Sequence, residues 1–340
     1  MDSLKVDEAA ALVTFRQLCT EQGLLKRPSE LSENDVVDGI NDETALLRFL
    51  QARRMKPEDA LEQFQQAATF HAEKNVHAFY NVISVDDYED TRRLYPHWTG
   101  RRDKQGQPIM MLNLVHLQHE AMTRWSETRN MPCADASVTS SPDMAQRVSV
   151  FHDGLTRFIL PLCTAMNDRP DSSIPVTKST YLVDASALSL KQVWNMKYFI
   201  QEVSWILFTC YPETIQHIFV CNAPSTFWMM WNMIKKFVDP RTADKLVILK
   251  STDVYSTLEP YIDHVNIPKQ FGGAFAYQHG MLPDLDEGIR QTLFWIDIKK
   301  CLPPGPLKWI QDGKNRKAIA TGSVGGIERA KEIAVLRSPE

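Results

Sequence analysis

The most constraining feature of this chain is a regular alternation of short apolar runs with long helical segments between residues 179 and 250. The apolar runs are STYLVD, HIFVCNAP and KLVILK, and the longest segment between them is LKQVWNMKYFIQEVSWILFTC. A strand–helix–strand–helix–strand order predicts right-handed crossovers and therefore a largely parallel sheet. The runs are apolar throughout, as strands are when helices cover both faces of a sheet. The sequence thus predicts an α/β fold.

The first 80 residues differ from this pattern and predict helices only. The segment NDETALLRFLQARR begins with Asn41 and Asp42, either of which can cap a helix. The segment after it begins with Pro57 and two acidic residues, as helix N-termini prefer. Further along, we expect a strand over 109–117, an exposed polar loop over 126–146, and a final strand or helix at the edge in the lysine-rich tail from about residue 303.

Composition narrows the class of protein. The 340 residues are 44% apolar and 24% charged, and the formal charge is −4. These values are ordinary for a globular chain and argue against one that coats nucleic acid. We find neither a signal peptide nor an apolar run of about 18 residues. The six cysteines form no C-x-x-C pair, which favours reduced thiols in a cytosolic protein.

The motifs of the common α/β enzymes are missing from the sequence. It contains no G-x-G-x-x-G after a strand, no G-x-x-x-x-G-K-[ST] and no G-x-S-x-G. His116 and His119 have a spacing that metal ligands can have, but on a strand they would point to opposite faces. We therefore expect neither an enzyme nor a cofactor.

A helix rich in tryptophan and methionine is predicted from residue 227. Its broad apolar arc is opposed by Asn232, Lys235 and Lys236. The arc consists of Phe227, Met230, Trp231, Met233, Ile234, Phe237 and Val238. However, Trp228 and Met229 fall on the lysine side. Either another element covers these two side chains, or this helix at times faces lipid.

The segment VDPRTADK follows this helix. Asp239 can cap a new helix with Pro240 at its first position, so that Thr242 and Lys245 share a face. Free amides at that helix start, the threonine hydroxyl and the ammonium group would suit a phosphate. The alternative is a capped helix with a solvated lysine. Likewise, Arg48, Arg53 and Arg54 can be simply the cationic end of a helix.

Five segments in order carry a family resemblance. They are LLRFLQARRMKPEDA, YPHWTGRRDKQGQPI, CYPETIQHIFVCNAP, FVDPRTADKLVIL and IPKQFGG. Over roughly residues 42–275 the chain resembles the CRAL-TRIO lipid-binding domain, and within it the fungal phosphatidylinositol/phosphatidylcholine transfer proteins. The resemblance implies a mixed, largely parallel sheet that floors an apolar cavity, closed by a mobile gate helix at about 225–238. The 126–146 loop and the tail lie outside it.

The resemblance also implies a binding site for an inositol lipid. Four positions match the family's headgroup residues in type: Arg53, Glu213, Thr242 and Lys245. Arg53 and Lys245 would neutralise the phosphate, Thr242 would donate a hydrogen bond, and Glu213 would bind an inositol hydroxyl or orient Lys245. The gate would contact membranes through Phe227, Trp228, Met229, Met230, Trp231, Met233 and Ile234.

The phosphatidylcholine residues of the family are mostly replaced here. Ser179 is kept, but the family's tyrosines, threonine and arginine are replaced by Thr99, Met110, His152, Tyr181 and Thr214. Because choline is commonly held by aromatic faces, a second ligand other than phosphatidylcholine is implied, such as a sterol or another apolar molecule.

These observations together predict a lipid carrier. We expect a helical unit over 1–80, a lipid-binding domain over 90–285 and a C-terminal extension over 286–340. The chain would carry phosphatidylinositol between membranes or present it to an inositol-lipid kinase, as a cytoplasmic monomer that visits membranes transiently and binds no nucleic acid. The alternative is a lipid-sensing module that regulates a protein partner.

Overall fold

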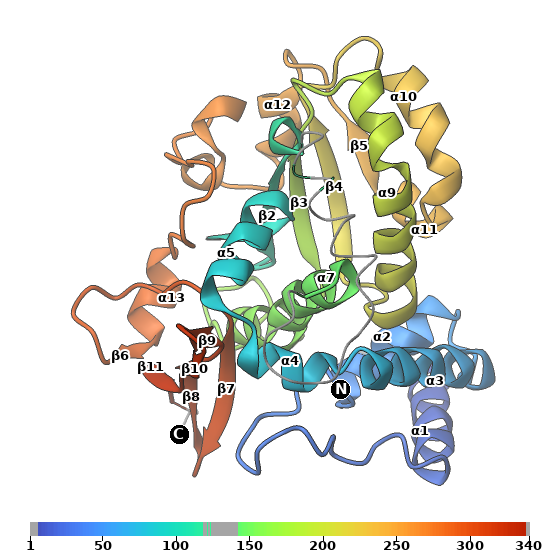
Figure 1. Ribbon diagram of the computed structural model, residues 1–340, viewed down its shortest axis with the longest axis vertical. Helices are drawn as coiled ribbons and strands as arrows, with labels where there is room; N and C mark the ends of the chain where they lie inside the picture. The colour runs from blue at the N-terminus through green and yellow to red at the C-terminus, as the bar shows by residue number, and fades with distance from the viewer. Residues whose placement is uncertain (1–5, 118–120, 122, 124–141, 338–340) are drawn as a thin grey trace.

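A five-stranded sheet organises the computed structural model, which describes residues 6–117, 121, 123 and 142–337 (Figure 1). Its strand order is β1-β2-β3-β4-β5. β1 and β2 are antiparallel, and the other neighbours are parallel. The strands are β1 His97–Arg102, β2 Pro108–Asn113, β3 Ser179–Asp184, β4 Ile215–Cys221 and β5 Leu246–Ile248. This mixed α/β architecture confirms the predicted fold class.

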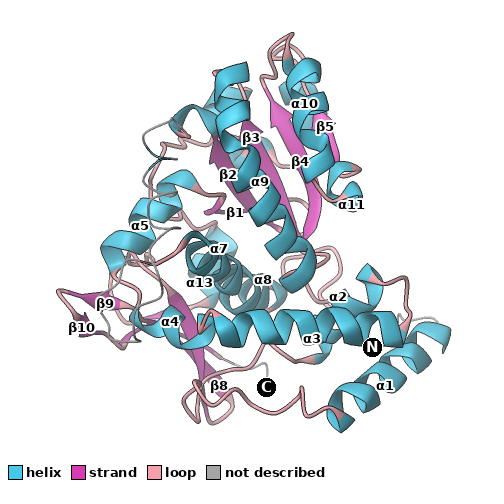
Figure 2. Ribbon diagram, turned by 45° about the vertical axis from the view of Figure 1, so that its right-hand side comes forward, coloured by secondary structure: helices cyan, strands magenta, loops and turns pink. Residues whose placement is uncertain are grey.

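The two faces of the sheet are covered by different elements, because side chains alternate along each strand. Met111 and Phe219 lie on the face packed by α12 (Val254–Leu258) and the residues after it. Leu112 and Val220 lie on the opposite face, with α9 (Leu190–Cys210) and α10 (Phe227–Ile234). Figure 2 shows these two helices side by side in front of the strands.

The N-terminal part is helical as predicted. Its helices are α1 Val6–Glu21, α2 Glu43–Ala52, α3 Pro57–Glu73, α4 Val76–Val82 and α5 Val85–Leu94. Asp42 caps α2 by accepting a hydrogen bond from the Ala45 amide, and Pro57 is the first residue of α3. α2 and α3 bury Leu46, Leu50 and Phe64 in one cluster that α1 completes.

Two predicted boundaries are wrong. The strand expected over 109–117 ends at Asn113, whose side chain accepts a hydrogen bond from Val115 and starts the 3-10 helix Leu114–His116. His116 therefore lies on no strand, and its ring stacks on His279. The loop expected over 126–146 ends earlier, because Asp143 caps α7 (Met144–Asp153) in a capping box. The loop's residues 126–141 and His119 lie outside the described residues.

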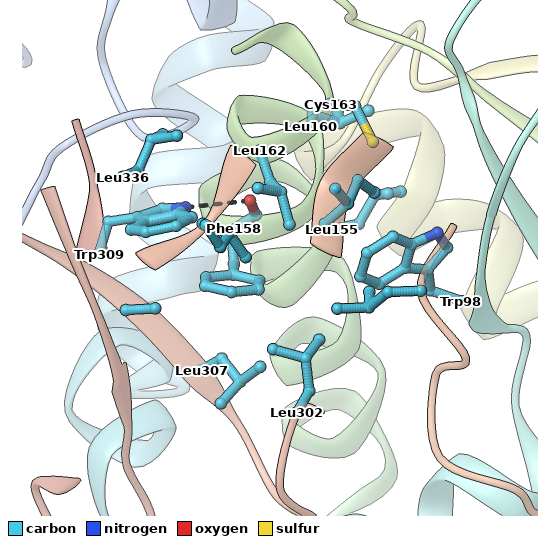
Figure 3. Close-up of a cluster of buried hydrophobic side chains, with 14 of the residues drawn as sticks. Trp98, Leu155, Phe158, Leu160, Leu162, Cys163, Leu302, Leu307, Trp309 and Leu336 are labelled. Atoms are coloured by element: carbon cyan, nitrogen blue, oxygen red, sulfur yellow. Dashed lines mark hydrogen bonds between the residues drawn. The ribbon is translucent and has the colours of Figure 1, made fainter. Parts of the chain in front are cut away.

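A continuous helical segment follows α7 and carries a large core. It consists of the π-helix Gly154–Ile159 and α8 (Leu160–Thr164). In Figure 3, Phe158 stacks on Trp309 with ring centroids 4.8 Å apart, and the Trp309 indole donates a hydrogen bond to the Phe158 carbonyl at 3.1 Å. Trp98 of the central sheet belongs to the same core. The C-terminal residues thus complete the core of the chain.

The C-terminal residues form a second sheet rather than a single edge element. It is antiparallel, with the order β6-β11-β8-β7, and a two-stranded hairpin accompanies it. The strands are β6 Phe294–Trp295, β7 Leu307–Asp312, β8 Asn315–Ala320, β9 Ser323–Val324, β10 Ile327–Glu328 and β11 Lys331–Leu336. Trp309 and Ala318 of this sheet are buried, whereas the lysines of its strands are half-buried or exposed.

The remaining elements are short helices. They are the 3-10 helices Lys235–Phe237, His264–Asn266 and Lys269–Phe271, with α11 Pro240–Ala243 and α13 Glu287–Thr292. Among the described residues, no helix combines the length and the apolar character that crossing a membrane requires.

Candidate functional site

An apolar cavity lies between the central sheet and the helices α9 and α10. Its volume is about 250 Å³. The sheet contributes Leu112, Val183 and Val220 to its wall, and α9 contributes Met196 and Leu207 among others. These are the faces that the alternation of the strands and the periodicity of α9 direct toward each other. The cavity therefore suits hydrocarbon.

α10 covers this cavity with one face only. Phe227, Trp231 and Ile234 line the cavity wall. Met230 is buried and Met233 is half-buried. On the opposite face, Trp228 is 62% exposed and Met229 is 57% exposed. The alternative that another element covers these two side chains is contradicted.

The neighbouring helix α9 exposes aromatic side chains that the sequence analysis did not single out. Trp194 and Tyr198 are each 59% exposed, four residues apart on one face. The Lys197 ammonium lies 4.0 Å from the Trp194 ring centroid and 4.7 Å from that of Tyr198. The sequence signal for this pair is aromatic residues at i and i+4 in the longest helical segment of the chain.

A small polar pocket lies where β4 begins, beside α11. Its volume is about 30 Å³, and Glu213, Thr242 and Lys245 line it together. The Lys245 ammonium lies 3.1 Å from Glu213 Oε2, and Arg241 Nη1 lies 3.7 Å from Glu213 Oε1. Three of the four predicted headgroup residues are thus brought together, and Arg241 joins them.

Arg53 lies at the edge of this pocket. It is the C-terminal capping residue of α2, and its guanidinium lies 4.8 Å from the ring centroid of Phe208. Phe208 and Ala52 both line the pocket. Lys178 lies near as well, since burial and then Lys245 lower its pKa while Glu213 opposes them. The sequence analysis missed Arg241 and Lys178, although Arg241 stands inside the quoted segment VDPRTADK.

We expected free backbone amides at the start of α11 to bind a phosphate, and this prediction is wrong. α11 is only four residues long. The Arg241 and Thr242 amides donate to the Asp239 side chain, at 3.0 and 3.3 Å. A capping aspartate of this kind occupies the amides that an anion would otherwise use. The donors for an anion are therefore side chains.

The polar pocket and the apolar cavity share part of their walls. Leu207, Ile215 and Thr242 line both of them. Thr242 lines the polar pocket together with Arg241 and Lys245, and it lines the apolar cavity together with apolar side chains. A molecule with a negatively charged end and an apolar body would therefore find sites for its two parts next to each other.

Two polar side chains lie in the wall of the apolar cavity with hydrogen-bonding atoms to spare. His152 Nδ1 has no hydrogen-bond partner among the described residues, and the Tyr181 hydroxyl has no well-aligned one there, although Ser179 lies near enough to oppose the rise in its pKa that burial causes. His152 Nε2 lies 2.8 Å from the Tyr95 hydroxyl. Burial lowers the pKa of His152 to about 3, so its ring is neutral at pH 7. These atoms can bind one neutral polar group.

The other replaced positions of the phosphatidylcholine set do not line this cavity. The Thr99 hydroxyl donates to the Ile109 carbonyl within the sheet, and Met110 faces a separate space of about 60 Å³. Thr214 lines the polar pocket, and its carbonyl accepts a hydrogen bond from the Ser179 hydroxyl at 2.8 Å.

The sequence of this chain is similar to those of a cytosolic factor and of a lipid-transfer protein. It is 25% identical to the SEC14 cytosolic factor of Candida glabrata over 283 residues, which are 79% of this chain and 87% of that protein. It is 23% identical over 234 residues to the phosphatidylinositol/phosphatidylcholine transfer protein SFH9 of Arabidopsis thaliana, covering 68% of this chain and 37% of that one.

A solved structure and a family model agree with these relatives. The crystal structure of Sfh5 matches 86% of this chain and 97% of that chain with a TM-score of 0.56, at 14% identity, which shows a shared fold. The model of the CRAL/TRIO domain matches residues 93–273. This match covers more than half of the 340 residues and includes the whole central sheet. The chain therefore belongs to the CRAL/TRIO domain family.

Proposed function

We propose that this chain binds phosphatidylinositol and exchanges it between membranes without chemical change to the lipid. The observation that carries the proposal is the wall that the cationic pocket shares with the apolar cavity, formed by Leu207, Ile215 and Thr242. The names of its relatives, which include phosphatidylinositol/phosphatidylcholine transfer proteins, support the same lipid class.

Each predicted headgroup residue has a role in this proposal. Lys245 and Arg53 neutralise the lipid phosphate, and Thr242 donates a hydrogen bond to it. Glu213, held between Lys245 and Arg241, keeps their cations in place and accepts from an inositol hydroxyl. Because Arg241 adds a further positive charge, the pocket keeps a net attraction for a phosphate while Glu213 is ionised.

Exchange requires α10 to move. The cavity of about 250 Å³ lies below the range of roughly 300–1,000 Å³ that small-molecule sites usually have. A lipid with two acyl chains therefore needs the gate displaced outward. Each acyl methylene that leaves water stabilises the complex by about 0.8 kcal/mol, so release occurs at a bilayer, where the chains stay in hydrocarbon.

The exposed side chains of α9 and α10 would contact the bilayer during this step. Trp228 and Met229 of the gate are exposed, and so are Trp194 and Tyr198 of the neighbouring helix α9. Tryptophan and tyrosine prefer the membrane–water interface. Membrane association would thus be transient and made by the same surface that opens.

Replacing both Trp228 and Met229 by serine should slow lipid exchange and leave stability nearly unchanged. Exposed side chains contribute little to folding, whereas burying a large apolar side chain in a bilayer is worth about 1.5–3 kcal/mol. Thermal melts and vesicle-transfer rates test this. Phe227→Ser is the matched variant, because Phe227 is buried and its loss should lower the melting temperature. Unchanged transfer by the folded double variant would contradict the proposal.

Phosphatidylcholine should be transferred poorly compared with phosphatidylinositol. Where the resemblance places the family's choline-binding tyrosines, this chain has Thr99, Met110 and His152, so the cation–π contacts that a choline group favours are reduced. We expect at least a tenfold difference in rate between the two lipids in one vesicle assay. Comparable rates for the two lipids would contradict the inference that these substitutions disfavour phosphatidylcholine.

The free atoms of Tyr181 and His152 suit a second ligand with a single neutral hydrogen-bonding group on an apolar body. A sterol has this composition, since its one hydroxyl can donate to His152 Nδ1 and accept from Tyr181. Such a ligand would occupy the apolar cavity in place of the phospholipid chains.

Extraction and mass spectrometry of the lipid that co-purifies with the chain test the proposed function directly. We expect phosphatidylinositol at close to one molecule per chain, and transfer of labelled phosphatidylinositol between vesicles. Bound phosphatidylinositol without transfer would favour presentation to an inositol-lipid kinase or regulation of a protein partner. Purified chain without any inositol lipid, even after incubation with vesicles that contain it, would contradict the proposal.

A further inference from the structure

A second cavity, of about 590 Å³, lies away from the lipid site and shares no lining residue with the apolar cavity. Four stretches of the chain enclose it, namely 38–48, 156–176, Thr292 and the C-terminal sheet with Arg316. Gly39, at φ +76°, approaches the second stretch so closely that a Cβ atom would lie 2.5 Å from the Thr156 carbonyl oxygen. The volume is typical of a small-molecule site.

Arg48 is a buried cation in the wall of this cavity. Arg48 is only 2% exposed. Its one hydrogen bond to a described residue is a long one, 3.5 Å from Nη2 to the Gly39 carbonyl, and its Nε has no partner among them. Burial lowers the pKa of Arg48, and Asp42 only opposes this. A buried guanidinium with free donors is costly unless an anion binds it.

The carboxylates of the cavity are already engaged. Asp38 accepts from Arg316 at 2.5 Å. One carboxylate oxygen of Asp42 accepts from the Gly39 and Ala45 amides at 2.9 and 3.2 Å. Arg337 lines the cavity with its guanidinium over the Phe294 ring, 3.7 Å from the centroid. The wall therefore holds three arginines against two aspartates.

Hydroxyl groups complete the lining. Thr156, Thr164 and Thr292 donate to the carbonyls of His152, Leu160 and Gly288 in turn. The Thr164 oxygen already accepts from the Val176 amide at 3.0 Å, whereas the oxygens of Thr156 and Thr292 keep lone pairs that can accept hydrogen bonds from a ligand. Asn167 and Ser172 are also in the wall. The cavity thus offers acceptors for hydroxyl groups around one unsatisfied cation.

From this arrangement we infer a second binding site, for a phosphate monoester of a sugar or polyol, with the phosphate on Arg48. A guanidinium binds phosphate oxygens in a bidentate manner, and the threonine oxygens accept from the hydroxyl groups of the ligand. The phosphate could belong to a free metabolite or to a lipid headgroup, and the two sources are separated by experiment.

Calorimetric titration of the full chain with glucose 6-phosphate tests the inference. We expect saturable binding that glucose does not reproduce, and at least tenfold weaker binding by Arg48→Met. The methionine replaces a buried charge, whose one hydrogen bond to a described residue is long, by an apolar side chain of similar length, so folding should survive. Arg93→Met, at an exposed arginine, and Lys245→Ala, in the lipid pocket, should bind as the unsubstituted chain does.

A second experiment measures binding of the chain to vesicles of phosphatidylcholine that contain phosphatidylinositol 4-phosphate. Binding of these vesicles that depends on Arg48, without binding of glucose 6-phosphate, would support the site with a lipid as the source. If Arg48→Met does not fold, Ala165→Trp fills the cavity and should abolish binding instead. Binding of neither probe, or equal binding by the folded variants, would overturn the inference. Transfer of phosphatidylinositol should be unaffected by Arg48→Met.

Discussion

Replacing Lys245 by alanine is expected to abolish phosphatidylinositol transfer. The substitution removes the ammonium group that lies 3.1 Å from Glu213 and leaves that carboxylate facing the lipid phosphate. The ammonium–phosphate pair would form only when the lipid binds, and truncating one partner of such a pair costs about 2–5 kcal/mol of affinity, which corresponds to roughly a thirtyfold loss or more. Arg53→Ala should have a similar effect, because Arg53 would supply the other cation. Transfer of labelled phosphatidylinositol between vesicles measures both.

Melting temperatures separate this effect from unfolding. Lys245 is partly exposed, and its removal should lower stability little. Lys299→Ala, at an exposed lysine far along the chain from the pocket, is the matched control and should transfer lipid normally. Transfer at the unsubstituted rate by both Lys245→Ala and Arg53→Ala would show that the headgroup is held elsewhere.

Acid should destabilise the chain well above the pH at which carboxylates titrate. His97 and His152 are buried, and burial lowers the pKa of His97 to about 4 and that of His152 to about 3. The unfolded chain protonates each at about 6.5, so it binds more protons than the folded chain below that pH. Each histidine then removes about 1.4 kcal/mol of stability per pH unit. Together they remove about 5 kcal/mol by pH 4.5.

Urea unfolding at a series of pH values measures this loss. The loss is a large part of the free energy of unfolding of a typical native protein, which is roughly 5–15 kcal/mol. His152→Gln cannot gain a proton and should reduce the slope of unfolding free energy against pH, between pH 6.5 and 4.5, by about 1.4 kcal/mol per unit. His264→Gln, at an exposed position, should leave the slope as it is. An unchanged slope in His152→Gln would refute the argument.

The parts of the fold that follow from local patterns were predictable. Alternating runs identified β3, β4 and β5, and capping residues placed the starts of α2 and α3. The end of β2 was not predictable in this way. The residues after Asn113 are apolar, as in a strand, but the Asn113 side chain accepts a hydrogen bond from Val115 and starts a 3-10 helix. The C-terminal sheet was missed because its strands mix apolar side chains with charged and polar ones, as in LKWIQD and NRKAIA, so its apolar side chains are visible as a face only after folding.

The site was predictable to the extent that it lies in contiguous motifs. Thr242 and Lys245 belong to one segment, and Glu213 and Arg53 were added by resemblance. Lys178 and the cavity around Arg48 depend on distant segments meeting in space, and no local pattern carries that information. The role expected for the backbone amides failed for a different reason, because the same Asp239 that predicts the helix start also occupies its donors.

The stacking of Trp309 on Phe158 has a consequence for how the chain is made. Trp309 comes from the C-terminal sheet, yet it fills the core beneath the π-helix about 150 residues earlier in the sequence. A ribosome that has completed the central sheet has therefore not yet made the residues that close this core. Domains usually fold as units while synthesis proceeds. We therefore expect the nascent chain to leave Phe158 without its Trp309 partner until the last strands emerge, a state in which exposed apolar surface favours aggregation.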